Sequence, residues 1–310
     1  MSDVVSIIVT VFNEEENVAP LIRSIRNSMA DFDYEIIFVD DGSTDRTLIN
    51  ILENREEDLI VLEFSKNFGQ SLALMAGIHQ AKGNILVTLD GDLQNDPSDI
   101  PVLIEKLKFS QCDMVIGNRR NRKDGWLFRK FPSLIANFII RNLSGVRLKD
   151  YGCALKAFSQ ELGISLGLYG ELHRFIPVLA VLEGARIVQV DVKHHHRLHG
   201  KSKYGLSRTF RVVSDLILML FYKKYSQKPM HLFGTTGLLL LLFGSITNLY
   251  LLFIKIQGND IWGKPLLILG LLLVISGFQF LTIGIIVEIQ MRTYFESQDK
   301  KPYKIRNIYD

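Results

Sequence analysis

The sequence contains little cysteine and little net charge, and both shortages exclude classes of protein. Its only two cysteines, Cys112 and Cys153, show neither the spacing of a metal site nor a disulfide framework, which favours reduced thiols in a cytoplasmic domain. The net charge is only +3 at pH 7, and the basic residues gather near long apolar segments. We therefore expect no nucleic-acid partner, and anionic lipid headgroups as the better match for these basic residues.

Two common phosphate-binding motifs are also missing. No Gly-x-Gly-x-x-Gly follows the first apolar run, and no Gly-x-x-x-x-Gly-Lys-Ser/Thr occurs anywhere in the chain. The dinucleotide-binding and P-loop interpretations therefore lose their main support. Phosphate groups would have to be held by a metal ion and side chains instead.

The first half of the chain alternates short β-branched runs with helical segments. Strands are expected at 4–11, 34–39, 59–64, 85–89 and 114–116, and helices after the first strand, at 44–54 and at 70–82. Asn13 and Glu16 have the spacing of a capping box, which predicts a helix start at Asn13. The alternation predicts a doubly wound α/β domain with a mainly parallel sheet covered on both faces.

Two long uncharged runs lie in the C-terminal part, at 232–254 and 265–287. Each is long enough for a bilayer-spanning helix, which needs about 20 residues; a pair of buried core helices is the alternative. The short connection predicts a hairpin, and the excess of lysine and arginine on both flanks predicts that these flanks are cytoplasmic. The N-terminal region, which no signal peptide precedes, would then be cytoplasmic too.

Two amphipathic stretches lie between the α/β region and the long runs. Apolar residues recur at helical spacing over 131–139 and 206–220, which suits helices in the membrane interface; packing on the soluble domain is the alternative. The predicted organisation has four parts: a cytoplasmic α/β domain at 1–205, a juxtamembrane helix at 206–228, a two-span hairpin at 229–290 and a cytoplasmic tail at 291–310.

Two carboxylates follow the apolar strand 85–89 directly. Asp90 and Asp92 stand one residue apart, where the end of a core strand opens into the crevice in which α/β sheets bind ligands. Carboxylate oxygens at such a position suit Mg²⁺ or Mn²⁺ beside a phosphate. Alone, the pair could equally be a solvated turn.

Four motifs together resemble the family 2 glycosyltransferases. Val-Phe-Asn-Glu-Glu at 11–15, Val-Asp-Asp-Gly-Ser-Thr-Asp at 39–45, Leu-Asp-Gly-Asp-Leu-Gln at 89–94 and Asp-Tyr-Gly-Cys-Ala-Leu-Lys-Ala-Phe at 150–158 occur in the order typical of that family. With the hairpin, the whole chain looks like the polyprenyl-phosphate glycosyltransferases, among them dolichyl-phosphate mannose synthases and bacterial undecaprenyl-phosphate glucosyl- and aminoarabinosyltransferases. The resemblance implies a GT-A fold and inverting transfer of one sugar from a nucleotide-sugar donor to polyprenyl phosphate, at the cytoplasmic face of the cytoplasmic membrane.

The resemblance also implies roles for residues at the strand ends. A divalent Mg²⁺ or Mn²⁺ would be held by Asp90 and Asp92, with Gln94 as an additional residue near the metal; Gln94 as a turn residue is the alternative. Asp92 and Asp150 are the expected catalytic residues, with Asp150 as the candidate base that orients the incoming phosphate oxygen. The nucleotide would be bound by five residues: Phe12, Glu14, Val39, Asp41 and Asp90.

A lipid phosphate is already an anion at neutral pH, because its second pKa is near 6. The enzyme must therefore overcome repulsion between the acceptor and the donor diphosphate, and cations are expected along the route from the membrane to the metal. The resemblance places Arg119 and Arg129 on the lipid phosphate and the segment 197–204 over the diphosphate. The candidates are Arg119, Arg129, Arg197, Lys201 and Lys203, each of which could instead be a plain surface cation.

Several alternatives remain open at this point. By analogy to the two-span bacterial branch the donor is expected to be a UDP-sugar, with a GDP-mannose-dependent mannose synthase as the alternative. A processive polysaccharide synthase usually has a Gln-x-x-Arg-Trp motif, which this sequence lacks, and a non-catalytic membrane scaffold is disfavoured by the intact carboxylates. Relatives with this layout form tetramers, so a homo-oligomer is expected.

Overall fold

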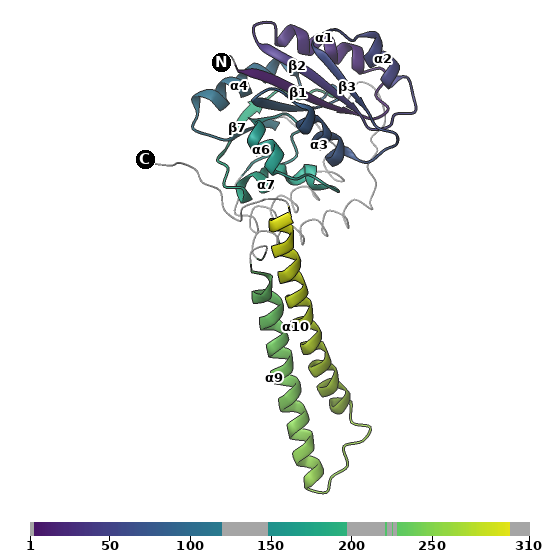
Figure 1. The fold of residues 1–310 in the computed structure, drawn as a ribbon, viewed down its shortest axis with the longest axis vertical. Coiled ribbons are helices and arrows are strands. Elements are labelled where there is room, and N and C mark those ends of the chain that lie inside the picture. Colours follow the sequence, from purple (N-terminus) through teal and green to yellow (C-terminus); the bar gives the residue numbers. More distant parts are fainter. Residues whose placement is uncertain (1–2, 120–147, 197–220, 222–224, 226–227, 298–310) are drawn as a thin grey trace. The chain divides into compact units, whose positions relative to one another are not determined.

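The computed structural model describes residues 3–119, 148–196, 221, 225 and 228–297 (Figure 1). The chain divides into two compact units, Met1–Asp215 and Leu216–Asp310. Both expected amphipathic stretches, at 131–139 and at 206–220, lie outside the described residues. The four-part division of the chain therefore stays a prediction.

A seven-stranded sheet with the order β3-β2-β1-β4-β6-β5-β7 forms the centre of the first unit. Neighbouring strands among β1 to β4 are parallel, whereas β6 runs antiparallel between β4 and β5, and β7 pairs with β5 in parallel. The predicted mainly parallel α/β sheet is confirmed. The strands are β1 (Val4–Val11), β2 (Asp33–Asp40), β3 (Leu59–Glu63), β4 (Ile85–Asp90), β5 (Met114–Arg119), β6 (Lys156–Ser159) and β7 (Ile187–Val192).

Helices cover both faces of this sheet. Figure 1 shows α1 and α2 on one side and α3, α6 and α7 on the other, which agrees with the contacts of α1 with α2 and of α3 with α6. Since the central strands are buried on both faces, they are mostly apolar, and Val5, Ile7, Ile8 and Val9 of β1 are fully buried. The helices are α1 (Val18–Ser28), α2 (Thr47–Glu53), α3 (Gln70–Gln80), α4 (Ile100–Phe109), α6 (Gln160–Ser165) and α7 (Ile176–Leu182), with short 3₁₀ turns η1 (Pro97–Asp99) and η3 (Leu172–Phe175).

The predicted capping box at Asn13 is wrong. Helix α1 begins only at Val18, and Asn13 has a left-handed backbone with φ of 52°, which asparagine tolerates better than most residues. Its Oδ1 accepts a hydrogen bond from the Thr44 N–H at 2.8 Å, and its own N–H donates to Ser43 Oγ at 2.9 Å. Asn13 therefore ties the loop after β1 to the loop after β2 instead of starting a helix.

Strand β1 lies between β2 and β4: the chain first adds β2 and β3 on one side of β1 and then adds β4 on the other side. Parallel α/β sheets bind ligands at such a switch point, outside the carboxyl ends of the strands. Here those ends are level, since Thr10 pairs with Asp90, and Val11 with Asp40. The fold therefore brings three of the four sequence motifs to one edge of the sheet.

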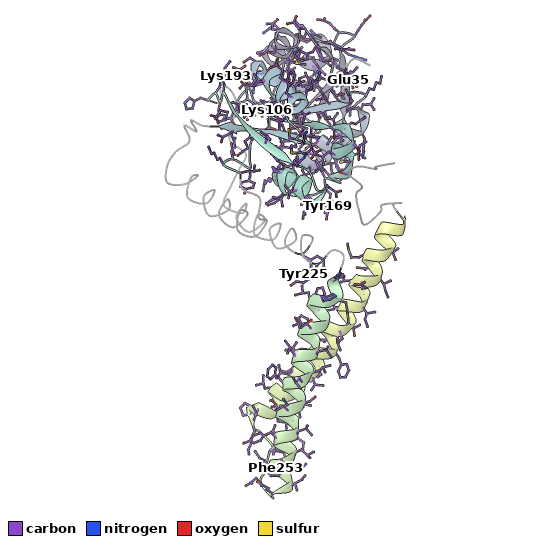
Figure 2. The ribbon with its side chains drawn as sticks, turned by 90° about the vertical axis from the view of Figure 1, so that its left-hand side faces the viewer. Glu35, Lys106, Tyr169, Lys193, Tyr225 and Phe253 are labelled. Carbon is purple, nitrogen blue, oxygen red and sulfur yellow. The ribbon has the colours of Figure 1, made fainter. Side chains whose placement is uncertain are left out.

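The second unit consists mainly of two long helices, α9 (Pro229–Ile256) and α10 (Pro265–Ser297), which pack against each other. Both contain a segment long and apolar enough to cross a membrane, Pro229–Ile256 with a mean hydropathy of 2.1 and Pro265–Met291 with one of 2.5 (Figure 2). Close packing depends on glycine, because a Cβ on Gly237 would lie 2.8 Å from the carbonyl oxygen of Gly277. The two expected apolar helices are confirmed, each somewhat longer than its apolar run.

Candidate active site

The acidic pair at the end of β4 is held by packing and by hydrogen bonds. Gly91 separates the two aspartates, and a Cβ there would lie 2.4 Å from Val11 Cγ1, so no larger residue fits. Asp90 accepts a hydrogen bond from Gln70 Nε2 at 2.7 Å, and Asp92 Oδ1 accepts one from the Gln94 N–H at 3.2 Å. Both carboxylates are thus oriented by neighbouring loops and by α3.

Burial and the nearby charge of Asp92 raise the pKa of Asp90 to about 6. Two like charges at a buried strand end are unfavourable, and a divalent cation would relieve that repulsion. Among residues 3–119, 148–196 and 228–297, no cluster of three or more His, Cys, Asp or Glu side chains could hold a metal ion. The pair therefore fits an Mg²⁺ or Mn²⁺ ion that takes one or two protein carboxylates and completes its shell with phosphate oxygens and water.

Two of the predicted nucleotide-binding carboxylates accept hydrogen bonds within the loops at the sheet edge. Asp41 is buried and accepts hydrogen bonds from the N–H groups of Phe68, at 2.7 Å, and Gly69, at 3.0 Å. Burial raises the pKa of Asp41, and these two hydrogen bonds oppose that shift. Glu14 is also buried, and its Oε2 accepts a hydrogen bond from Asn17 Nδ2 at 2.7 Å. The two side chains therefore fix the shape of this edge, where Phe12 is partly exposed.

The side chain of Val39, another predicted nucleotide-binding residue, points into the core. It is fully buried in β2 and packs near Gly77 of α3, where a Cβ would lie 3.3 Å from Val39 Cγ2. Its side chain has no surface on which a nucleotide base could pack. The prediction that Val39 contributes to nucleotide binding therefore stays a prediction, and it concerns the backbone of this residue.

Arg119 and Asp150, predicted for different roles, form one buried ion pair. Arg119 Nε lies 2.6 Å from Asp150 Oδ2, and Nη2 lies 3.0 Å from Oδ1, in a two-pronged arrangement. Burial disfavours the charged guanidinium, but the hydrogen bonds and charge of Asp150 outweigh it and raise the pKa of Arg119. The Gly152 N–H also donates to Asp150 Oδ1 at 3.0 Å. The carboxylate of Asp150 is therefore strongly anchored.

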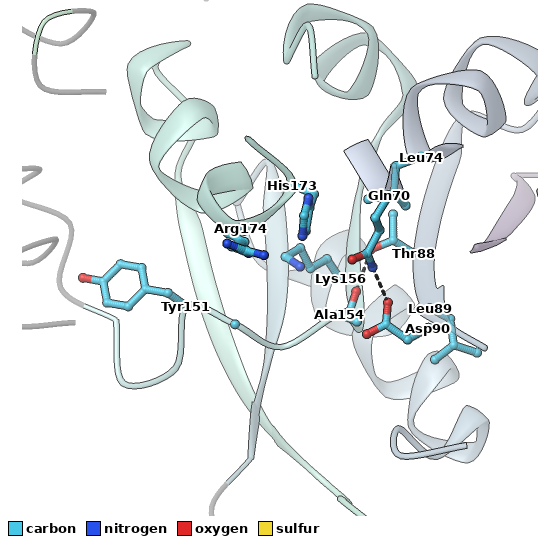
Figure 3. A pocket seen from close by; sticks show the side chains of 11 residues that line it. Gln70, Leu74, Thr88, Leu89, Asp90, Tyr151, Ala154, Lys156, His173 and Arg174 are labelled. Carbon is cyan, nitrogen blue, oxygen red and sulfur yellow. Dashed lines mark hydrogen bonds between the residues drawn. The ribbon is translucent and has the colours of Figure 1, made fainter. Parts of the chain in front are cut away.

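A pocket opens beside Asp90 in the first unit. Figure 3 shows Gln70 and Asp90 at one side of it and the polar ends of Lys156, His173 and Arg174 at the other. Lys156 is buried, donates a hydrogen bond to the Cys153 carbonyl oxygen, and has a pKa lowered by burial. Leu74, Thr88, Leu89, Tyr151, Gly152 and Ala154 complete the lining.

The residues opposite Asp90 come from β6 and η3. His173 Nδ1 lies 2.9 Å from Ser71 Oγ of α3, and Arg174 Nη2 lies 2.6 Å from Glu171 Oε2. The sequence interpretation did not name Gln70 or Lys156 as site residues. A lysine among the apolar residues of β6 was the available signal for Lys156, while nothing in the sequence pointed to Gln70.

Four predicted cations, Arg129, Arg197, Lys201 and Lys203, lie outside the described residues. Three consecutive histidines, at 194–196, precede Arg197, and His195 Nε2 lies 3.0 Å from Asp96 Oδ2. The backbone of this segment pairs with the loop that follows the acidic motif, through the His195 N–H and the Gln94 carbonyl at 2.8 Å. The run is thus attached to the edge that carries Asp92.

Comparison with known proteins identifies relatives along nearly the whole chain. The family described as Glycosyl transferase family 2 matches residues 6–163. A dodecaprenyl-phosphate galacturonate synthase of Rhizobium johnstonii is 44% identical over 98% of this chain and 93% of its own length. An undecaprenyl-phosphate 4-deoxy-4-formamido-L-arabinose transferase of Photorhabdus laumondii is 31% identical over 98% of this chain and 94% of its own.

Solved structures agree on the fold. Glucosyl-3-phosphoglycerate synthase from Mycobacterium tuberculosis, in complex with Mn²⁺, uridine diphosphate and phosphoglyceric acid, aligns with a TM-score of 0.56 and 20% identity. The alignment covers 71% of this chain and 78% of that one. The same enzyme in complex with Mg²⁺ and uridine diphosphate gives a TM-score of 0.55, with 18% identity and coverage of 71% and 79%. At this identity the likeness establishes the fold.

Proposed function

Since the chain belongs to the family 2 glycosyltransferases, we propose that it transfers one sugar, with inversion, from a nucleotide-sugar to polyprenyl phosphate. The observation that carries this proposal is the 44% identity to a dodecaprenyl-phosphate galacturonate synthase over 98% of the chain. That alignment includes the two apolar helices as well as the catalytic domain. A membrane-bound acceptor explains why a glycosyltransferase domain and such helices share one chain.

In this proposal Asp90 and Asp92 hold the divalent ion, with Gln94 next to them. When bound, Mg²⁺ or Mn²⁺ neutralises charge that grows on the departing nucleotide diphosphate. Asp150 orients the incoming phosphate oxygen, and Arg119 fixes the position of Asp150. Little proton transfer is required of Asp150, because the acceptor is already ionised at neutral pH.

The nucleotide is proposed to lie at the edge shaped by Glu14 and Asp41, with the partly exposed Phe12 available for contact with the base. The backbone that Val39 and Asp90 contribute completes this edge. A UDP-sugar donor rests on analogy with bacterial relatives of the same two-helix layout. The named relatives differ in the sugar they transfer, so their names leave the sugar of this chain open.

We further propose that both helices span the cytoplasmic membrane and that the catalytic domain faces the cytoplasm, as the basic flanks indicate. Cations would then lead the lipid phosphate to the metal. Arg119, anchored on Asp150, is one of these, and Arg129, Arg197, Lys201 and Lys203 are the others. A homotetramer stays a prediction by analogy.

The test is direct transfer. Purified full-length protein is incubated with Mg²⁺ or Mn²⁺, undecaprenyl phosphate and a panel of labelled UDP- and GDP-sugars, and the label that enters the organic phase is counted. We expect one nucleotide-sugar to label the lipid in a metal-dependent reaction. Label that appears only as free sugar in the aqueous phase would contradict the acceptor, and equal transfer in the presence of EDTA would contradict the metal.

A further inference from the structure

The pocket beside Asp90 contains more positive charge than binding of a neutral sugar requires. It is open to solvent and is lined by polar and apolar side chains in similar measure. Lys156 and Arg174 both contribute to its wall, together with His173. Hydroxyl groups are usually recognised by neutral amides, hydroxyls and single carboxylates, so two cations in one wall call for an anionic ligand.

Arg174 is the most informative of these residues. Its side chain is only 17% exposed, and Nη2 is engaged by Glu171 Oε2 at 2.6 Å. The other terminal nitrogen, Nη1, is buried and has no hydrogen-bond partner among the residues that the structure describes. A buried donor without a partner is unfavourable, so a bound molecule that accepts a hydrogen bond from Nη1 would remove that cost. Glu171 acts as a positioning residue that fixes the guanidinium plane.

Lys156, on the same side of the pocket as Arg174, strengthens the same argument. It is 5% exposed, and its ammonium group is held by the Cys153 carbonyl oxygen. In Figure 3 the polar ends of Lys156, His173 and Arg174 gather close together, on the side of the pocket away from the Gln70–Asp90 pair. A carboxylate is the planar anion that a guanidinium fork and a neighbouring ammonium bind well.

We propose that this pocket receives the sugar of the donor and that this sugar carries a carboxylate, as a hexuronic acid does. Arg174 binds the carboxylate through Nη1, and Lys156 supplies the second positive charge. The inference rests on the proposed function, in which the donor diphosphate is held at Asp90 and Asp92 beside the pocket. The diphosphate is thereby accounted for, and the acceptor phosphate is the remaining anion that could use Arg174.

Binding measurements on the full-length protein in nanodiscs with Mn²⁺ test the inference without requiring transfer. Isothermal titration compares two matched pairs, UDP-galacturonate with UDP-galactose and UDP-glucuronate with UDP-glucose. We expect the acidic member of at least one pair to bind about tenfold tighter or more, because a neutral analogue leaves the buried Nη1 of Arg174 without a carboxylate partner. Arg174→Met should remove most of this preference while binding of UDP alone is unchanged, and Arg174→Lys should retain part of it.

Arg186→Met is the matched control, since Arg186 is 48% exposed, belongs to the same unit and does not line the pocket. It should leave the preference unchanged. The inference is overturned if both members of each pair bind equally, if Arg174→Met weakens both equally, or if no UDP-sugar binds. It is also overturned if Arg174→Met instead raises the KM for undecaprenyl phosphate, which would assign Arg174 to the acceptor.

The proposed function and the inference that the donor sugar carries a carboxylate can be contradicted separately. A protein that prefers the uronate but places no label in the lipid phase keeps the inference and contradicts the proposed acceptor. A protein that labels the lipid with a neutral hexose and binds both members of each pair equally keeps the proposed function and contradicts the inference. Thermal midpoints of each variant show whether the fold is intact.

Discussion

Replacing Arg119 by leucine should destabilise the catalytic domain strongly. Arg119 and Asp150 are each only 10% exposed and are joined at 2.6 and 3.0 Å. Removing one partner of such a pair leaves a buried charge behind and costs about 3–5 kcal/mol. At about 2–4 °C per kcal/mol for a domain of this size, Arg119→Leu should lower the thermal midpoint by roughly 10 °C.

Circular dichroism of the full-length protein in detergent measures this midpoint. The double variant Arg119→Leu/Asp150→Asn should recover part of the lost thermal midpoint, because the uncompensated charge of Asp150 is removed as well. Arg186→Leu is the control, since its ion pair with Asp113 is exposed and worth about 1 kcal/mol or less. The reasoning is refuted if Arg119→Leu shifts the midpoint no more than the control does, because the Arg119–Asp150 pair would then contribute no more to stability than an exposed ion pair.

Three further perturbations test other parts of the structure. Hydrogen bonds from Arg26, together with its charge, hold the pKa of Asp58 below its usual value. The ionised Asp58 carboxylate therefore stabilises the fold above about pH 4, and this contribution is lost as the pH falls through the lowered pKa. Asp58→Asn should therefore be less stable than wild type in thermal unfolding at neutral pH, with a difference that narrows below about pH 4. Asn13→Ala should cost about 1–2 kcal/mol in thermal unfolding, because alanine disfavours a φ of 52°; Asn13→Gly should cost less. Gly277→Val should lower the midpoint of the helical hairpin, because a Cβ there lies 2.9 Å from a carbonyl oxygen of α9, whereas Leu272→Val on an exposed face should not.

The strands and the acidic motif could be predicted because each depends on local sequence. A β-branched run that ends in Asp90 reads as a core strand whatever surrounds it, and the apolar helices are recognisable by length alone. Asn13 shows the limit of such reasoning. Its spacing to Glu16 is that of a capping box, but the N–H of Thr44, which no local pattern reveals, competes successfully for its side chain.

The less predictable part of the site depends on contacts between distant segments. Gln70 reaches Asp90 because α3 returns across the sheet, and Asp150 meets Arg119 because β6 inserts antiparallel between β4 and β5. Arg174 enters the pocket from a 3₁₀ turn that no periodicity predicts. Sequence reasoning therefore located the acidic edge of the site and left the opposite wall undefined.

The most direct test of the central claim is the transfer rate of a variant in which both Asp90 and Asp92 are replaced by asparagine. It is measured with saturating Mg²⁺ or Mn²⁺, undecaprenyl phosphate and the preferred nucleotide-sugar, after circular dichroism has confirmed that the variant is folded. Since a bound metal contributes several kcal/mol of charge stabilisation, we predict that the rate falls by about a thousandfold or more. Transfer at the wild-type rate by the folded variant would contradict the account.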